Sequence, residues 1–165
     1  MTSGRTVELV GASLGPVKVE GSMVQTSVKV DPSVRDRISS SLAEASETAL
    51  PDRVFLHLEN VRGTPSAAVL GVYLNLPADA KPSDHPELFA GSVGLFGLRG
   101  ATAPHGRHGG QGLSFTLEIT KIVDALYLEN MLNLEALPVT VVSSTPLQGP
   151  APITIGRISV YRKGR

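Results

Sequence analysis

Histidine is the residue type whose chemistry would say most about this chain, which has four: His57, His85, His105 and His108. His105 and His108 are three residues apart in a glycine-rich stretch, so together they could hold a divalent metal ion weakly. Two imidazoles without a carboxylate or a third ligand nearby do not make a tight site, and the alternative is a solvated loop with incidental histidines. His57 falls on the polar face of an expected strand and His85 in a turn-rich loop, so both read as surface residues.

Other groupings of catalytic residues are missing from the sequence. Gly91-Ser92-Val93-Gly94 is the nearest approach to the G-x-S-x-G turn that presents a nucleophilic serine, and its spacing differs. The glycines between Gly94 and Gly112 lack the G-x-x-x-x-G-K-[ST] spacing that cradles a phosphate. The chain has no cysteine and therefore no thiol nucleophile or thiolate metal site. We expect no catalysis by this chain on its own, and no bound cofactor.

Composition excludes several classes of partner. The 165 residues include 15 basic and 15 acidic side chains, so the formal net charge is zero. A nucleic-acid binder needs a basic face for phosphate contacts, so we expect no nucleic-acid partner. The apolar stretches are shorter than the ~20 residues that span a bilayer, so we expect no membrane segment. The first residues lack an apolar signal core, which makes a cytoplasmic location the default expectation.

Seventeen glycines and twelve prolines separate short apolar runs, a texture typical of a β-rich domain. Alternating apolar and polar residues predict strands at 6–10, 17–20, 23–30, 53–61, 68–76, 88–98, 113–119, 138–142 and 153–161. In the last of these the apolar face shifts by one residue at Gly156 and Arg157, which predicts a β-bulge. We expect a mainly β fold, an antiparallel β-sandwich or jelly-roll-like barrel with one or two short helices.

Two segments have helical features. Asp31 and Pro32 suit an N-cap and a first helical turn, and an apolar stripe follows from Val34 at i, i+4, i+8 and i+11. This polar stretch could equally be a linker that helps to wrap a partner. Thr120 can cap a second helix over residues 121–128, with Ile122, Ala125 and Leu126 as its apolar stripe. We expect residues 1–50 to form a strand-containing linker segment with a short helix, and residues 51–165 to form the β-sandwich domain.

Large apolar side chains at outward positions of the expected strands suggest a surface that meets another protein. They are Phe55, Tyr73, Phe89, Leu95 and Phe96. Phe96 is the most informative, because its bulky ring stands among glycines close to an expected loop. The alternative is that Phe89 and Phe96 simply close the core of the sandwich.

Five segments occur in a characteristic order along the chain. They are RVFLHLENVRGT at 53–64, VYLNLP at 72–77, HPELFAGS at 85–92, LEITKIVD at 117–124 and ITIGRIS at 153–159. Together they resemble the C-terminal β-domain of tyrosinases and plant polyphenol oxidases. The stretch VELVGA at 7–12 resembles the segment that joins this domain to the catalytic domain, so the resemblance covers nearly the whole chain.

The resemblance implies a lid rather than a catalyst. In that family a helical domain holds two copper ions with six histidines and oxidises phenols to quinones, while the C-terminal domain covers the mouth of the site and keeps the enzyme latent. The expected partner is therefore a type-3 copper catalytic domain, in the same polypeptide or in trans, which holds the copper. The expected plug is Phe96 or, less favoured, Leu95. By the same resemblance, His105 and His108 could pass copper to the partner, and the domain could aid folding or copper loading.

A second hypothesis has no link to phenol oxidation. On this interpretation the chain is a stand-alone β-sandwich module for protein interaction, and its exposed apolar residues join it to other proteins or to copies of itself as a homo-oligomer.

Overall fold

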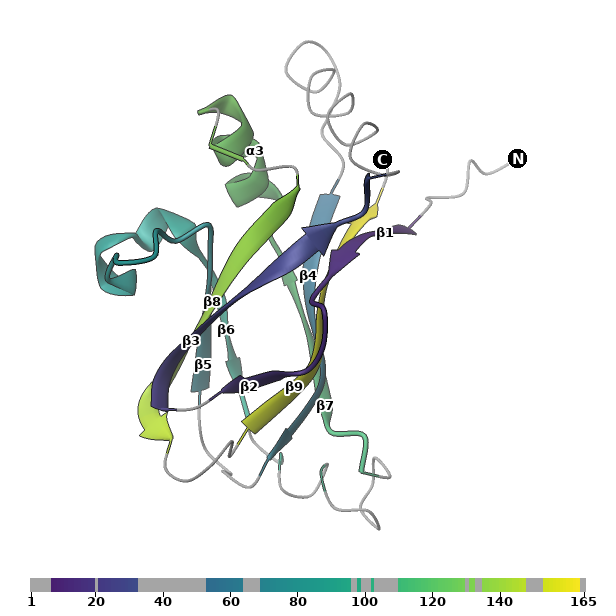
Figure 1. Ribbon diagram of the computed structural model, residues 1–165, viewed down its shortest axis with the longest axis vertical. Helices are drawn as coiled ribbons and strands as arrows, with labels where there is room; N and C mark the ends of the chain where they lie inside the picture. Colours follow the sequence, from purple (N-terminus) through teal and green to yellow (C-terminus); the bar gives the residue numbers. More distant parts are fainter. Residues whose placement is uncertain are drawn as a thin grey trace.

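In the computed structural model, one antiparallel sheet curls into a nearly closed barrel (Figure 1). The structure describes residues 7–19, 21–32, 53–63, 69–95, 98, 102, 110–129, 131–132, 135–147 and 153–163, with side chains of 144–147 left out. The strands are β1 (Val7–Ala12), β2 (Val17–Val19), β3 (Gly21–Val30), β4 (Arg53–Gly63), β5 (Val69–Leu74), β6 (Phe89–Gly94), β7 (Leu113–Glu118), β8 (Ala136–Leu147) and β9 (Ile153–Lys163). The expected mainly β class is confirmed.

The strand order is β6-β5-β8-β3-β1-β9-β4-β7, and β2 also pairs with β9. β1 lies between β3 and β9, so strands from both sides of the boundary expected near residue 50 share this one sheet. The pairing between β3 and β1 extends over few residues, because only Lys29 and Val30 of β3 have register partners on β1. The two halves of the barrel, β6-β5-β8-β3 and β1-β9-β4-β7, are therefore joined mainly at one end of this boundary.

The interior is filled by the apolar residues that alternate along the strands. Leu56 and Leu58 of β4, Leu70 of β5, and Ile155 and Ile158 of β9 are fully buried. β3 follows the same alternation, because Val28 is fully buried while its neighbours Ser27 and Lys29 are exposed. Period-two burial of this kind is what closes a sheet around one apolar core.

The barrel is sealed by packing where β6 approaches β7, since no hydrogen-bonded pairing joins these two strands in the sheet. Gly91 of β6 has a φ of +148°, in the region that favours glycine. A Cβ added at Gly91 would lie 3.0 Å from Cδ2 of Leu117 on β7. The missing side chain of Gly91 thus leaves room for Leu117 to cover this seam.

The face shift predicted in β9 is present, but it is not a bulge against β4. Ile155 and Ile158 are both buried, and β4 shifts in the same way between Leu58 and Val61. The two strands stay in register because both carry the extra residue. On β4 that residue is Asn60, with a φ of 55°, and its pairing with β7 changes register there.

The helix α3 (Thr120–Leu128) lies at one end of the barrel (Figure 1). The prediction that Thr120 caps it is wrong, because Thr120 is the first helical residue and its hydroxyl bonds elsewhere. Val54 N donates to Thr120 Oγ1 over 2.9 Å, and Oγ1 donates to Glu118 Oε2. The buried face includes Val123 and Leu126, whereas Ala125 of the predicted stripe is exposed.

Two short 3₁₀ helices, η1 (Pro82–Asp84) and η2 (Pro86–Leu88), occupy the loop between β5 and β6. The helix expected to follow Asp31 lies outside the described residues beyond Pro32.

Candidate functional site

One outer surface of the barrel, formed by β1, β9, β4 and β7, carries most of the charge. Residues that pair directly across neighbouring strands lie on the same side of a sheet, so the register identifies the outward side chains. The charged ones are Arg53, Glu59, Arg62, Glu118, Arg157 and Lys163. We name this surface the charged face.

Glu59 is the centre of a hydrogen-bonded cluster on the charged face. Arg157 donates twice to its carboxylate, from Nε over 2.8 Å and from Nη2 over 3.2 Å. The fully buried Ser159 donates its hydroxyl to the same carboxylate, and Arg157 Nη2 also lies 3.1 Å from Tyr161 Oη. Burial acts to raise the pKa of Glu59, but these donors outweigh it and hold that pKa below its ordinary value. The cluster therefore satisfies its own charges and ties β4 to β9.

Phe55, an expected interface residue, is half-buried on the charged face. The guanidinium carbon of Arg53 lies 5.0 Å from the centre of the Phe55 ring, and Arg53 Nη2 donates to Glu118 Oε1 over 2.8 Å. Beside it, the rings of His57 and Tyr161 lie 4.7 Å apart. Phe55 thus already has partners within this chain.

The other outer surface, formed by β6, β5, β8 and β3, is almost without charge. Lys29 alone is charged among the outward side chains that the structure describes on these four strands. Tyr73 and Phe89, both expected interface residues, lie here with ring centroids 5.2 Å apart. Phe89 is 42% exposed and Met23 of β3 is 41% exposed. We name this surface the uncharged face.

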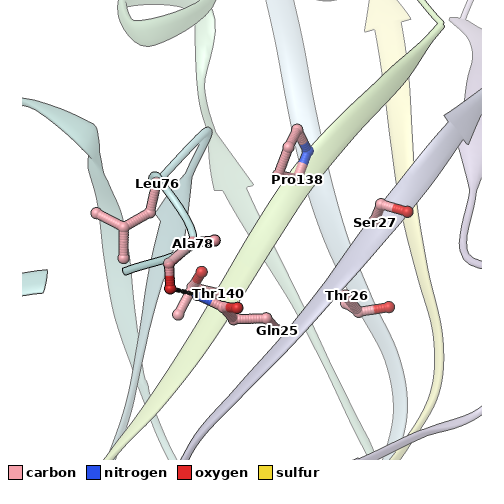
Figure 2. Close-up of a pocket in the computed structure, with 7 residues that line it drawn as sticks. All are labelled: Gln25, Thr26, Ser27, Leu76, Ala78, Pro138 and Thr140. Carbon is pink, nitrogen blue, oxygen red and sulfur yellow. Dashed lines mark hydrogen bonds between the residues drawn. The ribbon is translucent and has the colours of Figure 1, made fainter. Parts of the chain in front are cut away.

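A groove of about 440 Å³ opens on the uncharged face where the chain leaves β5 (Figure 2). It is lined by Gln25, Thr26, Ser27, Leu76, Ala78, Pro138 and Thr140. Gln25 Nε2 donates to the carbonyl oxygen of Ala78 over 3.4 Å, which links β3 to the segment after β5 (Figure 2). Its polar groups are hydroxyls and amides, so it can accept a neutral hydrogen-bonding group but supplies no general acid or base.

The structure places one of the two plug candidates inside the barrel. Leu95 directly follows β6 and is fully buried in the main core cluster, so it does not project toward a partner here. Phe96, His105 and His108 lie outside the described residues, and their roles stay predictions.

Asp124 on α3 is a feature that the sequence pattern did not single out. Its Oδ1 is buried and has no hydrogen-bond partner among the described residues, and burial raises the pKa of this carboxyl. In the sequence, the burial of Asp124 could have been inferred only from its position next to Val123, which is buried in the helix.

A family model described as a domain of unknown function, DUF7868, matches residues 6–163. The chain belongs to the DUF7868 family. Among curated proteins, this DUF7868 chain is similar to Tyrosinase HcTyr1 of Hahella sp. (strain CCB-MM4), with 24% identity over 109 residues, which are 66% of this chain and 23% of that protein.

Solved structures show the same fold. The DUF7868 chain superposes on a latent aurone synthase (polyphenol oxidase) with a TM-score of 0.56 and 15% identity, covering 91% of this chain and 25% of that one. For latent apple tyrosinase the TM-score is 0.54 at 21% identity, covering 89% and 27%. The expected resemblance to the C-terminal domain of tyrosinases and polyphenol oxidases is confirmed. The chain spans about a quarter of the length of each of these relatives.

The DUF7868 chain does not have the residues for a dicopper centre. The family resemblance implies six histidine ligands, and the sequence has four histidines. Of the two that the structure describes, His57 lies on β4 and His85 pairs with Glu87 in the loop after β5, Nδ1 to Oε1 at 3.1 Å. Within the described part of the chain, no three histidine or acidic residues are grouped so that they could hold a metal ion.

Among the residues that the structure describes, no helix is long and apolar enough to cross a membrane.

Proposed function

We propose that this chain is the non-catalytic C-terminal shielding domain of a tyrosinase or polyphenol oxidase, which docks over the dicopper site and keeps it latent. The observation that carries the proposal is the match of 91% of this chain to a quarter of a latent polyphenol oxidase. The catalytic partner, in the same polypeptide or in trans, would hold the copper.

The barrel has the physical properties that such a shield needs. Its inward residues are packed as one core, and the Glu59 cluster and the Leu117 seam tie its strands together, so the outer faces keep a fixed shape. A shield with a stable interface would bury on the order of 1,600 Å² in total. Inhibition is then occlusion, and a tether strengthens it by raising the effective concentration of the shield.

Phe96 is the proposed plug that enters the substrate pocket. It follows the buried Leu95, which leaves Phe96 as the better of the two candidates. A supporting role in folding or copper loading of the partner, with His105 and His108 as transfer ligands, is a further part of the proposal.

A second candidate function is a stand-alone interaction module. The exposed Phe89 and Met23 on the uncharged face favour it, because such side chains are enriched in protein interfaces. Self-association without any effect on a phenol oxidase would distinguish this module from the shield.

The proposal is tested by titrating this chain into a copper-loaded tyrosinase catalytic domain from the same organism. Binding is followed by calorimetry, and the rate of diphenol oxidation is followed in parallel. We expect saturable binding and a matching loss of rate. Neither binding nor inhibition at tens of micromolar would overturn the shield and favour the interaction module.

A further inference from the structure

We infer that the uncharged face, formed by the outward residues of β3, β5, β6 and β8, is the surface that contacts the catalytic part of the enzyme. This inference rests on the proposed shielding function and adds to it which side of the barrel docks.

The distribution of charge over the barrel favours the uncharged face as the docking surface. Charged residues are depleted in the centre of protein interfaces, while aromatic residues and methionine are enriched there. Tyr73, Phe89 and Met23 on the uncharged face match that composition. On the charged face, by contrast, docking would have to desolvate the bonded pairs of Glu59 with Arg157 and of Arg53 with Glu118.

The uncharged face also has a shape and hydrogen-bonding groups that suit a protein partner. The groove on the uncharged face is lined by neutral polar groups, so a protein loop with backbone amides or carbonyls could enter it without burying a charge. Gln25 reaches Ala78 across a long 3.4 Å bond at its edge, which a stronger partner group could replace. The groove and the exposed ring of Phe89 thus form a patch with both apolar and hydrogen-bonding contacts.

The partner that best fits the uncharged face is a tethered catalytic domain. About three quarters of each solved relative lies outside the part that this chain matches, so in those relatives a large protein body is tethered to this fold. Interfaces that stay closed are more apolar than those that form transiently. An aromatic face on which Lys29 is the one charged strand residue that the structure describes therefore suits a permanently tethered catalytic domain.

The test compares exposed apolar residues on the two faces. Phe89→Glu and Met23→Glu place a charge on the uncharged face, where the parent side chains are 42% and 41% exposed. Leu9→Glu is the matched control, because Leu9 is 41% exposed and pairs with Tyr161 on the other half of the barrel. Each variant of the full chain is titrated by calorimetry into the copper-loaded tyrosinase catalytic domain from the same organism. Thermal unfolding of each variant checks its fold.

We expect Phe89→Glu and Met23→Glu to weaken binding on the order of tenfold or more, and Leu9→Glu to leave it within about twofold. If Phe89→Glu unfolds the chain, Ser92→Glu replaces it, since Ser92 is an exposed outward residue of β6.

Three results would overturn the inference. Wild-type binding that Leu9→Glu weakens and the uncharged-face variants do not would move the interface to the charged face and leave the shielding function standing. No binding by the wild-type chain would overturn the shielding function as well. Sedimentation showing a dimer that Phe89→Glu dissociates, without binding to the catalytic domain, would assign the face to a second copy of this chain.

Discussion

The buried hydroxyl of Ser159 donates to the Glu59 carboxylate, and a hydrogen bond to a charged group is worth about 1.5–3 kcal/mol. Since Arg157 still supports the carboxylate, we expect Ser159→Ala to lower the free energy of unfolding by about 1.5 kcal/mol at pH 7. Urea unfolding measures the change, and Ser27→Ala, on an exposed strand position, is the control with no expected loss.

This loss should depend on pH in a defined direction. The folded protein lowers the pKa of Glu59 below its ordinary 4.5, so the stabilisation exists above pH 4.5 and is lost as the pH falls through the lowered pKa. The difference between wild type and Ser159→Ala should therefore shrink in acid. A difference that is the same at pH 7 and in acid would contradict the role given to this carboxylate.

The pKa of Asp124 is shifted in the opposite direction to that of Glu59, so its effect on stability has the opposite dependence on pH. Its pKa is raised by burial, so the stability it contributes is present below its ordinary pKa of 3.8 and is lost as the pH rises through the raised pKa. We expect Asp124→Asn to raise the midpoint of thermal unfolding at pH 7, by roughly 2–4 °C for each kcal/mol gained. The gain should vanish toward pH 3.8 and be absent in Asp84→Asn, because Asp84 is exposed. A lower midpoint for Asp124→Asn at pH 7 would show that the carboxylate stabilises the fold.

At the scale of elements, the seam between β6 and β7 depends on a missing side chain. Gly91→Ala would combine a strained φ of +148° with a Cβ only 3.0 Å from Leu117, so we expect a loss of about 1–3 kcal/mol. Gly15→Ala is the control, since nothing lies within 4 Å of its Cβ position, and we expect a change within about 0.5 kcal/mol. Equal unfolding free energies for the two variants would show that the seam tolerates a side chain.

The inward faces of the strands could be predicted from the sequence because they depend on local alternation. Val28 and Leu56 show this, and so does the face shift in β9. Features that depend on distant residues could not be predicted. The Thr120 hydroxyl accepts from Val54 instead of capping its helix, the shift in β9 is matched by one in β4, and Leu95 turns into the core.

The candidate surfaces could likewise be predicted only in part from the sequence. Phe55, Tyr73 and Phe89 could be identified as outward residues from alternation alone. Alternation did not show that Phe55 stands on a different face from Tyr73 and Phe89, or that Arg53 lies over its ring. Strand order decides these points, and it is set by pairings between residues far apart in the sequence.

At the scale of the whole molecule, the barrel has two unlike outer surfaces. One carries the Glu59–Arg157 and Arg53–Glu118 ion pairs, and the other carries Tyr73 and Phe89, with Lys29 as the one charged residue described on its strands. A shield needs this difference, because one side must exclude water against the enzyme while the other stays in solvent. The proposed Phe96 plug supplies the remaining part, a side chain that occupies the place of the substrate.

The central claim is occlusion, and the mode of inhibition tests it most directly. Diphenol oxidation by the copper-loaded catalytic domain is measured over a range of substrate concentrations at several fixed concentrations of this chain. Because shield and substrate would compete for one pocket, we predict that the apparent KM rises while kcat is unchanged, and that Phe96→Ala reduces the rise in KM. A fall in kcat with no change in KM would contradict occlusion.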